Sequence, residues 1–466
     1  MRVLPPLLLA AALPLLSMLP AAANAAVAAP VVITSPDPCA AAGASDFDGD
    51  GVDDAVVGDP LADAAGNDGA GAVHVLSGRG GKGITVTASE PAAGDGFGWS
   101  VKLTHLDADR CADLLVGAPY TDVSGQEDAG AVYAVYGGAP RGLTRLTARE
   151  PEADAHFGWS LAARGPVVAV GAPHENADGV DDSGAVHLFE ARELGDARRI
   201  SQNTDGVTGN GEVGDMFGWA VELGELGGDA GEVDLAVGLP HENDDGTGVQ
   251  VDEGNLDSGA IGILFDVRKN RGEQVSKKWD LREVAKAEAG DRFGYALAYG
   301  REGGTGYLAV GAPLGDGGSV KDSGLVHLFR AAEDAEIAPM TTFSQKDGVP
   351  GEGYGFALAF SEGGGLRLAV GAPFAGPDRR GAVSLVPVGA PDQVRLVSGS
   401  GPGERFGWSV AASGNKLVVG APDRGASGGV ALLGRNDGAD TPVAPGAGNV
   451  PALDGGVSVD FGAATG

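Results

Sequence analysis

The feature that most constrains this chain is a short apolar run closed by Gly-x-Pro, which recurs along the sequence. It occurs seven times in the same setting, at 55–60, 114–119, 168–173, 235–240, 308–313, 368–373 and 417–422. After a variable polar loop, each copy is followed by a small residue or glycine and an alternating apolar stretch. A Phe-Gly or Tyr-Gly element precedes six of the copies, at 97–101, 157–161, 217–221, 293–297, 354–358 and 406–410. Ordered self-similarity of this kind indicates a repeat architecture.

Each repeat is predicted to form four short β-strands, because its apolar runs are bounded by Gly, Asp and Pro turns and show no helical period. A linear array of such units would leave long strand edges and half-buried sheet faces. Radial packing buries each face against the next unit and leaves only short outer edges. The sequence therefore predicts an all-β fold, a seven-bladed β-propeller of four-stranded antiparallel blades.

The conserved spacing of glycines and aromatic residues has a physical reason in such a ring. A glycine has no Cβ, so backbones can crowd near the centre and positive φ angles become accessible. The Phe and Trp of the Phe-Gly-Trp elements are expected to wedge between adjacent sheets, each burying on the order of 150–250 Å².

The number of motifs also predicts how the ring closes. The first Gly-x-Pro run has no Phe-Gly element before it, whereas Phe461 and Gly462 stand near the C-terminus without a run after them. We expect the C-terminal strand to complete the first blade; a frayed tail is the alternative.

The first 25 residues have the order of parts of a secretory signal peptide. Arg2 precedes a Leu- and Ala-rich stretch that ends in small residues around Ala23 and Ala25. The alternative is an uncleaved membrane anchor, although the run is short and interrupted by Pro14 and Pro20. The predicted organisation is therefore a signal peptide at 1–25, an N-terminal segment at 26–45 and a propeller at 46–466. The mature protein is expected to be secreted, with no membrane span.

Charge and cysteine content limit the partners and the compartment. The net charge of −32 argues against a nucleic-acid partner, because a polyanion would be repelled, and it suits cation binding. The chain has two cysteines, Cys39 and Cys111. In an exported protein such a pair is expected to form a disulfide rather than two free thiols.

The Phe-Gly element followed by a polar loop and Gly-Ala-Pro resembles the FG-GAP repeat, as found in the propeller of integrin α subunits and in bacterial secreted integrin-like proteins. The resemblance spans 46 to 462. It implies a seven-bladed propeller with cation loops on one face and partner contacts on the opposite face. The integrin stalk domains, transmembrane helix and cytoplasmic tail have no counterpart in this sequence, so a receptor role and heterodimerisation are not carried over.

The strongest candidate site is the loop that begins at Asp46. Asp46, Asp48, Asp50 and Asp54 fall at positions 1, 3, 5 and 9 of the loop, and the carbonyl of Val52 falls at position 7. Hard cations take six to eight oxygen ligands, and this alternation points carboxylates inward from one turn. Val57 stands where an EF-hand needs Glu, so the loop looks like the β-hairpin calcium loop of FG-GAP proteins. We expect Ca²⁺ here; an acidic hairpin without an ion is the alternative.

A second, weaker cation loop lies at 105–113. Asp107, Asp109 and Asp113 align with the acidic residues of the first loop, but His105 stands at position 1 and Arg110 replaces the glycine. The disulfide at Cys111 is the alternative support for this hairpin. The remaining repeats have Gly-rich turns or the longer 224–234 loop, and no ion is expected there.

Two loops on the opposite face share the sequence His-Glu-Asn, with His174, Glu175 and Asn176 in one and His241, Glu242 and Asn243 in the other. They are candidates for a ligand site; residues that merely cap repeated hairpins are the alternative. None of the serines of the Phe-Gly-Trp-Ser elements lies in a Gly-x-Ser-x-Gly nucleophile elbow, and no His-Glu-x-x-His motif is present, so no enzyme activity is expected.

The sequence as a whole predicts a secreted, Ca²⁺-binding propeller that acts as an integrin-like adhesion or recognition module. Its expected partner is an extracellular protein or glycan, and the chain is expected to be a monomer. A carbohydrate-binding propeller is the first alternative, although the face loops offer few aromatic residues (Tyr120 and Phe374). A hydrolase that uses acids of the propeller loops is the second.

Overall fold

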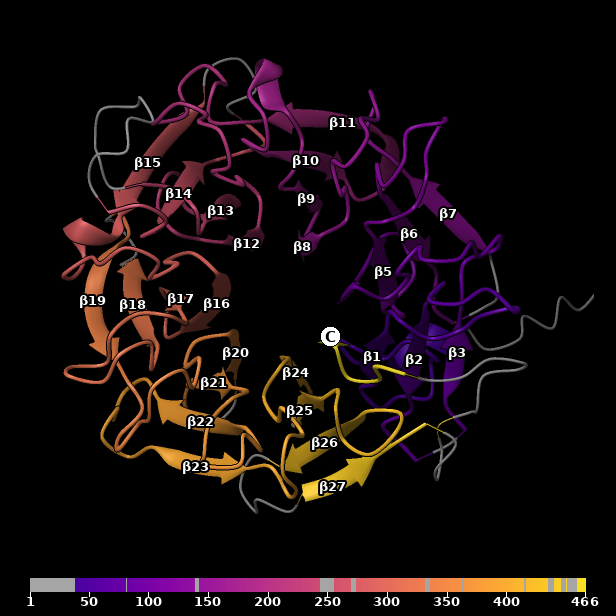
Figure 1. Ribbon diagram of the computed structural model, residues 1–466. Helices are drawn as coiled ribbons and strands as arrows, with labels where there is room; N and C mark the ends of the chain where they lie inside the picture. Colours follow the sequence, from indigo (N-terminus) through magenta and orange to yellow (C-terminus); the bar gives the residue numbers. More distant parts are fainter. Residues whose placement is uncertain are drawn as a thin grey trace, which may run out of the picture. The chain divides into compact units, whose positions relative to one another are not determined.

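Seven four-stranded antiparallel sheets make up the described part of the chain, and Figure 1 shows them arranged around a common centre. The computed structural model describes residues 38–80, 82–138, 142–243, 255–269, 274–331, 336–362, 364–414, 416–434, 440–445, 450 and 459–466. The predicted signal peptide at 1–25 lies outside these residues, as does most of the segment 26–45. The predicted fold, a seven-bladed β-propeller, is confirmed.

Within each blade the four strands follow one another from the centre of the ring outward (Figure 1). The innermost strands are β28 (Ala464–Thr465), β4 (Ser100–Thr104), β8 (Ser160–Arg164), β12 (Ala220–Gly224), β16 (Ala296–Glu302), β20 (Ala357–Ser361) and β24 (Val410–Ser413). The second strands hold the Gly-x-Pro runs and are β1 (Ala55–Asp59), β5 (Asp113–Ala118), β9 (Val167–Ala172), β13 (Asp234–Leu239), β17 (Thr305–Ala312), β21 (Arg367–Ala372) and β25 (Lys416–Ala421).

The third strands are β2 (Ala72–Leu76), β6 (Ala131–Val135), β10 (Ala185–Glu190), β14 (Ala260–Phe265), β18 (Leu325–Ala331), β22 (Ala382–Pro387) and β26 (Gly429–Gly434). The outer strands are β3 (Ile84–Val86), β7 (Leu143–Leu146), β11 (Glu193–Ile200), β15 (Val275–Asp280), β19 (Ala338–Phe343), β23 (Arg395–Ser398) and β27 (Asp440–Val443). The helical segments among the described residues are three short 3₁₀ turns, η1 (Pro38–Ala41), η2 (Ala177–Gly179) and η3 (Leu281–Glu283).

Burial explains why the second and third strands are so apolar. Every residue of β1, β2, β5 and β6 is buried, because each blade is covered by a neighbour on both faces. The outer strand β19, in contrast, is exposed along almost its whole length. The core is therefore a set of layers between blades.

Glycine is required where neighbouring blades touch. A Cβ on Gly58 of the first blade would lie 2.1 Å from the carbonyl oxygen of Gly98 in the second. A Cβ on Gly117 would lie 2.1 Å from the carbonyl oxygen of Gly158 in the third. The contact recurs between each pair of neighbouring blades around the ring, so any side chain at these positions would push two blades apart.

The aromatic wedge between blades is only half as expected. The first aromatic residue of each Phe-Gly element is completely or almost completely buried, from Phe97 at 0% to Tyr354 at 2% exposed. The third residue, such as Trp99 or Trp159, is instead only partly buried. The prediction that Trp wedges between sheets was therefore wrong, because that side chain lies at the start of the innermost strand and contacts its counterpart in the next blade.

The ring closes as predicted. The strand β28 pairs with β1, with Val57 opposite Thr465 and Gly58 opposite Ala464. The backbone of Gly466 exchanges two hydrogen bonds of 3.0 Å with Val56, and the N–H of Gly462 donates to the carbonyl of Gly58 at 3.0 Å. Phe461 is fully buried at this junction. The first blade is therefore built from both ends of the propeller.

Candidate functional site

The order of the strands divides the polar loops between two faces of the ring. The Phe-Gly turns precede the innermost strands and the loops after Gly-x-Pro follow the second strands, so both lie at one end of each antiparallel pair. The hairpins between innermost and second strands lie at the opposite end. We call these ends the aromatic face and the hairpin face.

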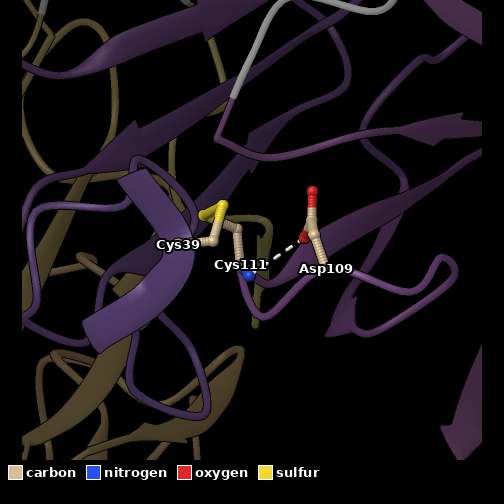
Figure 2. A group of neighbouring side chains, drawn as sticks. All are labelled: Cys39, Asp109 and Cys111. Atoms are coloured by element: carbon tan, nitrogen blue, oxygen red, sulfur yellow. Dashed lines mark hydrogen bonds between the residues drawn. A yellow bond between two sulfur atoms is a disulfide. The ribbon is translucent and has the colours of Figure 1, made fainter. Parts of the chain in front are cut away.

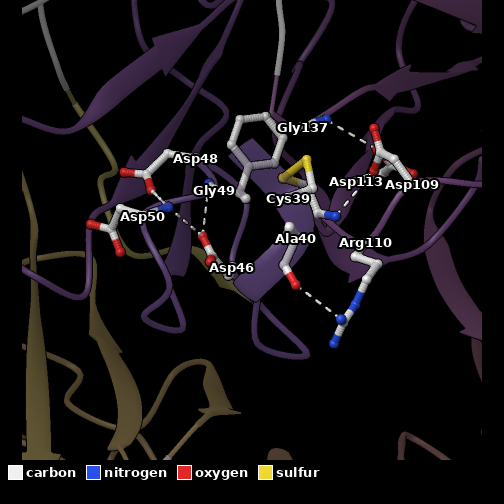
Figure 3. Close-up of a disulfide and its surroundings, with 12 residues drawn as sticks. Cys39, Ala40, Asp46, Asp48, Gly49, Asp50, Asp109, Arg110, Asp113 and Gly137 are labelled. Atoms are coloured by element: carbon white, nitrogen blue, oxygen red, sulfur yellow. Dashed lines mark hydrogen bonds between the residues drawn. A yellow bond between two sulfur atoms is a disulfide. The ribbon is translucent and has the colours of Figure 1, made fainter. Parts of the chain in front are cut away.

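On the hairpin face, the loop 46–54 is folded around two carboxylates. The side chain of Asp46 accepts hydrogen bonds from the N–H groups of Gly49 (2.8 Å), Asp50 (3.2 Å) and Gly51 (2.7 Å). The side chain of Asp54 accepts from Phe47 (2.9 Å) and from Gly78 (2.9 Å). Figure 3 shows the turn, with Asp46, Asp48 and Asp50 drawn around it.

The structure brings three of the predicted ligands together. Carboxylate oxygens of Asp46, Asp48 and Asp54 lie within 4.8 Å of one another. Asp50 is directed elsewhere, since it accepts a hydrogen bond from the Ser77 hydroxyl (3.1 Å) and lies 3.7 Å from the Arg79 guanidinium. Val52 is 36% exposed, and its N–H donates to the Asp50 side chain.

The electrostatics of this loop suit a hard cation. Burial raises the pKa of Asp54 to about 6, and the charge of Asp48 adds to the rise. Burial and the charges of Asp50 and Asp46 also raise the pKa of Asp48. Clustered carboxylates that disfavour their own ionisation are stabilised by a divalent cation, and the donors present are all oxygens, as Ca²⁺ prefers. The residues therefore fit the ion that the sequence predicts.

The second hairpin repeats the backbone of the first. The side chain of Asp113 accepts hydrogen bonds from Leu106 (2.6 Å) and Gly137 (3.0 Å), as Asp54 does from Phe47 and Gly78. Asp109 accepts the N–H of Cys111 at 3.0 Å (Figure 2), and Asp107 accepts that of Asp109 at 2.9 Å. These two side chains therefore hold the turn itself.

The predicted disulfide is present. Cys39 and Cys111 are joined across 72 residues of sequence, which fastens η1 to the second hairpin (Figure 3). The guanidinium of Arg110 donates to the carbonyl of Ala40 at 2.9 Å and adds a second link. Asp109 lies beside both sulfur atoms, but cysteines in a disulfide are not thiolate ligands, so this group is not a metal site.

A third hairpin of the same kind was not recognised from the sequence. In the fourth blade Asp234 accepts hydrogen bonds from Leu226 (2.6 Å) and Asp266 (2.8 Å), and burial raises its pKa to about 7. Here the ammonium of Lys269 lies 2.8 Å from Asp229 and 3.2 Å from Glu232. A lysine side chain thus pairs with two acids of this loop. An extra residue in the loop hid its alignment with the other two.

On the aromatic face, the glutamates and asparagines of the two His-Glu-Asn loops contact residues of their own blades. Glu175 is 5% exposed and contacts His187 (2.7 Å) and Arg199, whereas Glu242 is 4% exposed and contacts Lys278 (2.8 Å). The Asn176 side chain accepts the N–H of Asp182 (2.9 Å).

The asparagine of the second loop has the same role, since Asn243 accepts the N–H of Asp257 (2.9 Å). His174 and His241 are half-buried, and each contacts one tryptophan, Trp159 and Trp219 respectively, with ring centroids 5.9 Å apart. Within each loop the histidine is therefore the residue in contact with these rings.

A continuous set of aromatic rings lines this face, and the sequence analysis did not foresee it. The third residues of six Phe-Gly elements contact one another in order around the ring, and we call them the aromatic belt: Trp99, Trp159, Trp219, Tyr295, Phe356 and Trp408. Successive ring centroids are 4.7 to 5.5 Å apart. The seventh position is Ala463, so the belt is interrupted at the blade where the ring closes. The sequence feature that indicates this belt is an aromatic residue directly after the glycine of the Phe-Gly element in six repeats.

A cavity of about 420 Å³ opens beside the belt. Three belt residues line it, Trp219, Tyr295 and Phe356, together with Phe374 and Leu314. Its polar groups are His241, Arg292 and Arg379. The guanidinium of Arg292 contacts Nδ1 of His241 at 2.6 Å, and burial, with a further contribution from Arg292, lowers the pKa of His241 to about 4. A largely apolar cavity with a few polar groups is typical of a binding site.

The serines of the Phe-Gly-Trp-Ser elements have a structural role. The hydroxyls of Ser100, Ser160 and Ser409 each donate to the carbonyl of the Phe-Gly glycine in the next blade, at 2.7, 2.8 and 2.9 Å. A hydroxyl used in this way is not activated by a neighbouring base, as a nucleophilic serine would be.

Comparison with known proteins identifies the repeat. The FG-GAP repeat family matches residues 84–136, 142–189 and 393–432. Several integrin α subunits match as well, among them integrin alpha-PS2 of Drosophila melanogaster, which is 31% identical over 211 residues, 41% of this chain and 14% of that protein. The chain is an integrin-like FG-GAP β-propeller.

Two further proteins that are not integrins are similar to this chain. Phosphatidylinositol-glycan-specific phospholipase D of Bos taurus is 28% identical to this FG-GAP propeller over 161 residues, 31% of this chain and 18% of that protein. The crystal structure of a putative 6-phosphogluconolactonase from Bacteroides uniformis matches with a TM-score of 0.49 and 10% identity, covering 89% of this chain and 98% of that one. A likeness that weak says nothing about activity.

The FG-GAP propeller spans less than a fifth of the length of these curated relatives, at 14% and 18%. The similarity therefore concerns the propeller of each relative. It supports a module for recognition or adhesion, of the type to which divalent cations generally bind. Among the described residues, no helix has the length and hydropathy needed to cross a membrane.

Proposed function

We propose that this protein is a secreted, calcium-stabilised recognition module that binds an extracellular protein on its aromatic face. The observation that carries the proposal is the aromatic belt with its adjoining cavity. Half-buried rings that are held rigidly in register form a preorganised surface, and aromatic residues are enriched where proteins bind one another. The similarity to integrin α subunits supports the same role.

The chemistry of the belt indicates what the partner presents. Tryptophan and tyrosine faces attract cationic and flat apolar groups, and the protein carries a net charge of −32. A partner with an apolar projection would therefore gain from the rings, and basic groups around that projection would gain from the negative field of the protein. Ala463 leaves the belt one position without an aromatic ring. The surface is therefore not symmetric around the ring of blades, and a partner can bind it in one orientation.

Calcium belongs to the opposite face in this proposal. Asp46, Asp48 and Asp54, with the carbonyl of Val52, would hold the ion in the loop 46–54, and Asp50 would join them by turning away from Ser77. The ion would supply positive charge to a hairpin whose carboxylates repel one another. For the loop 105–113 we propose that the disulfide and Arg110 take this role, and that Asp107, Asp109 and Asp113 hold the turn without an ion.

Export is proposed from the predicted signal peptide at 1–25 together with the disulfide. Disulfides persist in oxidising compartments and are rare in the cytosol. We further propose that the exported chain is a monomer and has no enzymatic activity. The serines of the repeats are engaged between blades.

A glycan is the second candidate for the ligand, because the belt supplies the aromatic surfaces that the face loops alone lack. Sugars stack on such rings. A hydrolase that uses acids of the loops is the remaining candidate, and the similarity to a phospholipase D over 18% of its length keeps that candidate testable.

The test compares the intact secreted protein with a Trp159→Ala/Trp219→Ala variant on a panel of purified extracellular proteins and on a glycan array. We expect the wild type to bind at least one protein, and the variant to bind it at least tenfold more weakly, as loss of about 1.4 kcal/mol or more would produce. Leu396→Ala is the control, because Leu396 is 53% exposed on the outer strand β23. A melting curve for each variant verifies that it is folded.

Three results would change the proposal. Equal binding by the wild type and the belt variant would move the site away from the aromatic face. Binding to glycans alone would favour the second candidate. Absence of binding together with hydrolysis of a generic ester or phosphodiester would favour an enzyme.

A further inference from the structure

The fourth blade contains a second group of carboxylates, on the opposite face from the calcium loop. Glu212, Asp215 and Glu242 are 5%, 0% and 4% exposed, and one oxygen of each lies within 4.8 Å of the others. Glu212 and Asp215 precede the Phe-Gly turn before β12, and Glu242 follows β13. Buried carboxylates are rare unless something neutralises them.

The third blade shows one way in which the glutamate at this position is paired. Glu175 corresponds to Glu242 in the repeated His-Glu-Asn sequence, and it contacts both His187 and Arg199. His187 pairs with Arg199 across β10 and β11, at the register where Gly262 pairs with Lys278 across β14 and β15.

Blade four lacks one of these two partners, because Gly262 stands where the third blade has His187. It also has a carboxylate that the third blade lacks, since Asp215 stands in place of Ala155; an acid at this position is common in the repeat, as at Asp95, Asp291, Glu352 and Glu404. A Cβ on Gly262 would meet no atom closer than 3.9 Å, so the volume of the missing imidazole is not refilled at that point.

The ion pairs of this region reach two carboxylates. Lys278 lies 2.8 Å from Glu242 and 3.3 Å from Asp280, and Arg282 reaches Asp280 at 3.6 Å. None of these contacts reaches Asp215, which is fully buried. Burial, followed by the charge of Glu242, raises the pKa of Asp215 to about 8.

A neutral side chain provides an independent indication of a ligand. Gln202 is 3% exposed, and its Nε2 donates to Glu242 at 2.9 Å, so its carboxamide points into the group. Among the described residues, no hydrogen-bond donor reaches its Oε1 or the Oδ1 of Asp215. Buried oxygens without a donor are unfavourable, and a metal ion would satisfy both.

We propose that Glu212, Asp215, Glu242 and the carbonyl oxygen of Gln202 form a second Ca²⁺ site, in the fourth blade and separate from the loop 46–54. All four donors are oxygens, which hard cations select. Ca²⁺ accepts six to eight oxygen ligands in a flexible geometry, whereas Mg²⁺ demands a near-ideal octahedron, so a site assembled from separate turns suits Ca²⁺. Its charge would also offset the repulsion among the buried carboxylates.

Calorimetric titration of the chelator-treated secreted protein with Ca²⁺ tests this site. The wild type is expected to bind two ions, one in each site. Asp48→Asn, which disables the loop 46–54, is expected to retain one, and Asp48→Asn/Asp215→Asn none. Asp291→Asn is the matched control: Asp291 caps the corresponding turn of the fifth blade by accepting the N–H of Glu288 at 2.7 Å, as Asp215 accepts that of Glu212 at 2.7 Å.

Gln202→Leu removes an oxygen without changing the charge, and it is expected to weaken the second ion about tenfold. This variant keeps the test decisive if Asp215→Asn does not fold. The proposal is overturned if Asp215→Asn and Asp291→Asn bind the same number of ions, or if Gln202→Leu leaves both affinities unchanged. A proton shared by Asp215 and Glu242 would give that result, with no Ca²⁺ dependence of either variant.

Discussion

Equivalent positions of the repeat hold the same residue in different environments. His74, His187 and His327 occupy one place on the third strand, where the imidazole packs against the buried aromatic residue of the Phe-Gly element. The imidazole of His187 faces a carboxylate. Those of His74 and His327 instead each lie 3.0 Å from a threonine hydroxyl. Burial lowers the pKa of both His74 and His327 to about 4. The repeat thus contains two histidines that are neutral in the folded state.

These two histidines should make the fold sensitive to mild acid. As pH falls below 6.5, the unfolded chain binds protons that the folded protein does not, so the free energy of unfolding decreases until about pH 4. Each histidine should cost roughly 2 kcal/mol at about pH 5. Urea unfolding between about pH 7.5 and pH 5 should therefore show a steeper loss of stability for the wild type than for His74→Gln/His327→Gln.

The control for the acid experiment is His105→Gln, because His105 is exposed. Its pH profile should match the wild type. Identical slopes for the wild type and the double variant would contradict the assignment of buried neutral imidazoles.

Sequence reasoning at this scale succeeded where a pattern is local. The spacing of Asp46, Asp48 and Asp54 within nine residues was enough to predict their convergence. The orientation of Asp50 toward Ser77 was not predictable, because that hydroxyl comes from the following hairpin. The group formed by Glu212, Asp215 and Glu242 was missed for the same reason, since a neighbouring strand decides whether a buried acid is neutralised.

At the scale of elements, the missing Phe-Gly element correctly located the closing strand. The motifs predicted four strands in each blade, and their count predicted that the first blade combines strands from both ends of the chain. Side-chain direction was harder: the Trp of Phe-Gly-Trp was assigned to the sheet interface because tryptophan is large and apolar. The Trp follows the glycine by one residue. The register of the innermost strand therefore places its side chain on the aromatic face and not between the sheets.

Removal of the closing strand should destabilise the whole ring. Deletion of 459–466 removes the buried Phe461 and leaves β1 with an unpaired edge on its inner side. Loss of one buried Phe costs about 3–5 kcal/mol, and the exposed edge favours association between chains. We expect the melting temperature to fall by at least roughly 3–6 °C, measured by circular dichroism.

A point variant separates the side chain from the strand. Phe461→Ala should account for a large part of the loss, because Phe461 is fully buried. An unchanged melting temperature after the deletion would show that the pairing of β28 contributes nothing.

At the scale of the molecule, the loop 46–54 connects three blades. The carbonyl of Asp46 accepts the N–H of Ala112 at 2.8 Å, and that of Phe47 accepts the N–H of Gly138 at 2.8 Å, both in the second blade. The hydroxyl of Ser413, in the seventh blade, donates to the carbonyl of Asp54. The loop and the disulfide therefore lie together at the junction where the ring closes.

The aromatic belt belongs to the same scale. No single repeat contains it, because each ring packs against the equivalent residue of the next blade. A sequence shows the aromatic residue in each repeat but not their mutual contact, which depends on the radius of the ring and the tilt of its innermost strands.

Removal of Ca²⁺ should loosen the closure of the ring more than the rest of the propeller. An ion at a hundred times its dissociation constant stabilises the folded state by about 2.7 kcal/mol, which corresponds to roughly 3 °C in melting temperature for a propeller of this size. Chelation should lower the melting temperature of the wild type by at least that amount. The further drop should be small in Asp48→Asn/Asp215→Asn, which lacks both proposed ions. Hydrogen exchange should distinguish the two sites: chelation of Asp215→Asn should deprotect amides in β1, β5 and β25, whereas chelation of Asp48→Asn should deprotect those in β12 and β13. Uniform deprotection around the ring, or a melting temperature that chelation leaves unchanged, would show that neither loop depends on an ion for its structure.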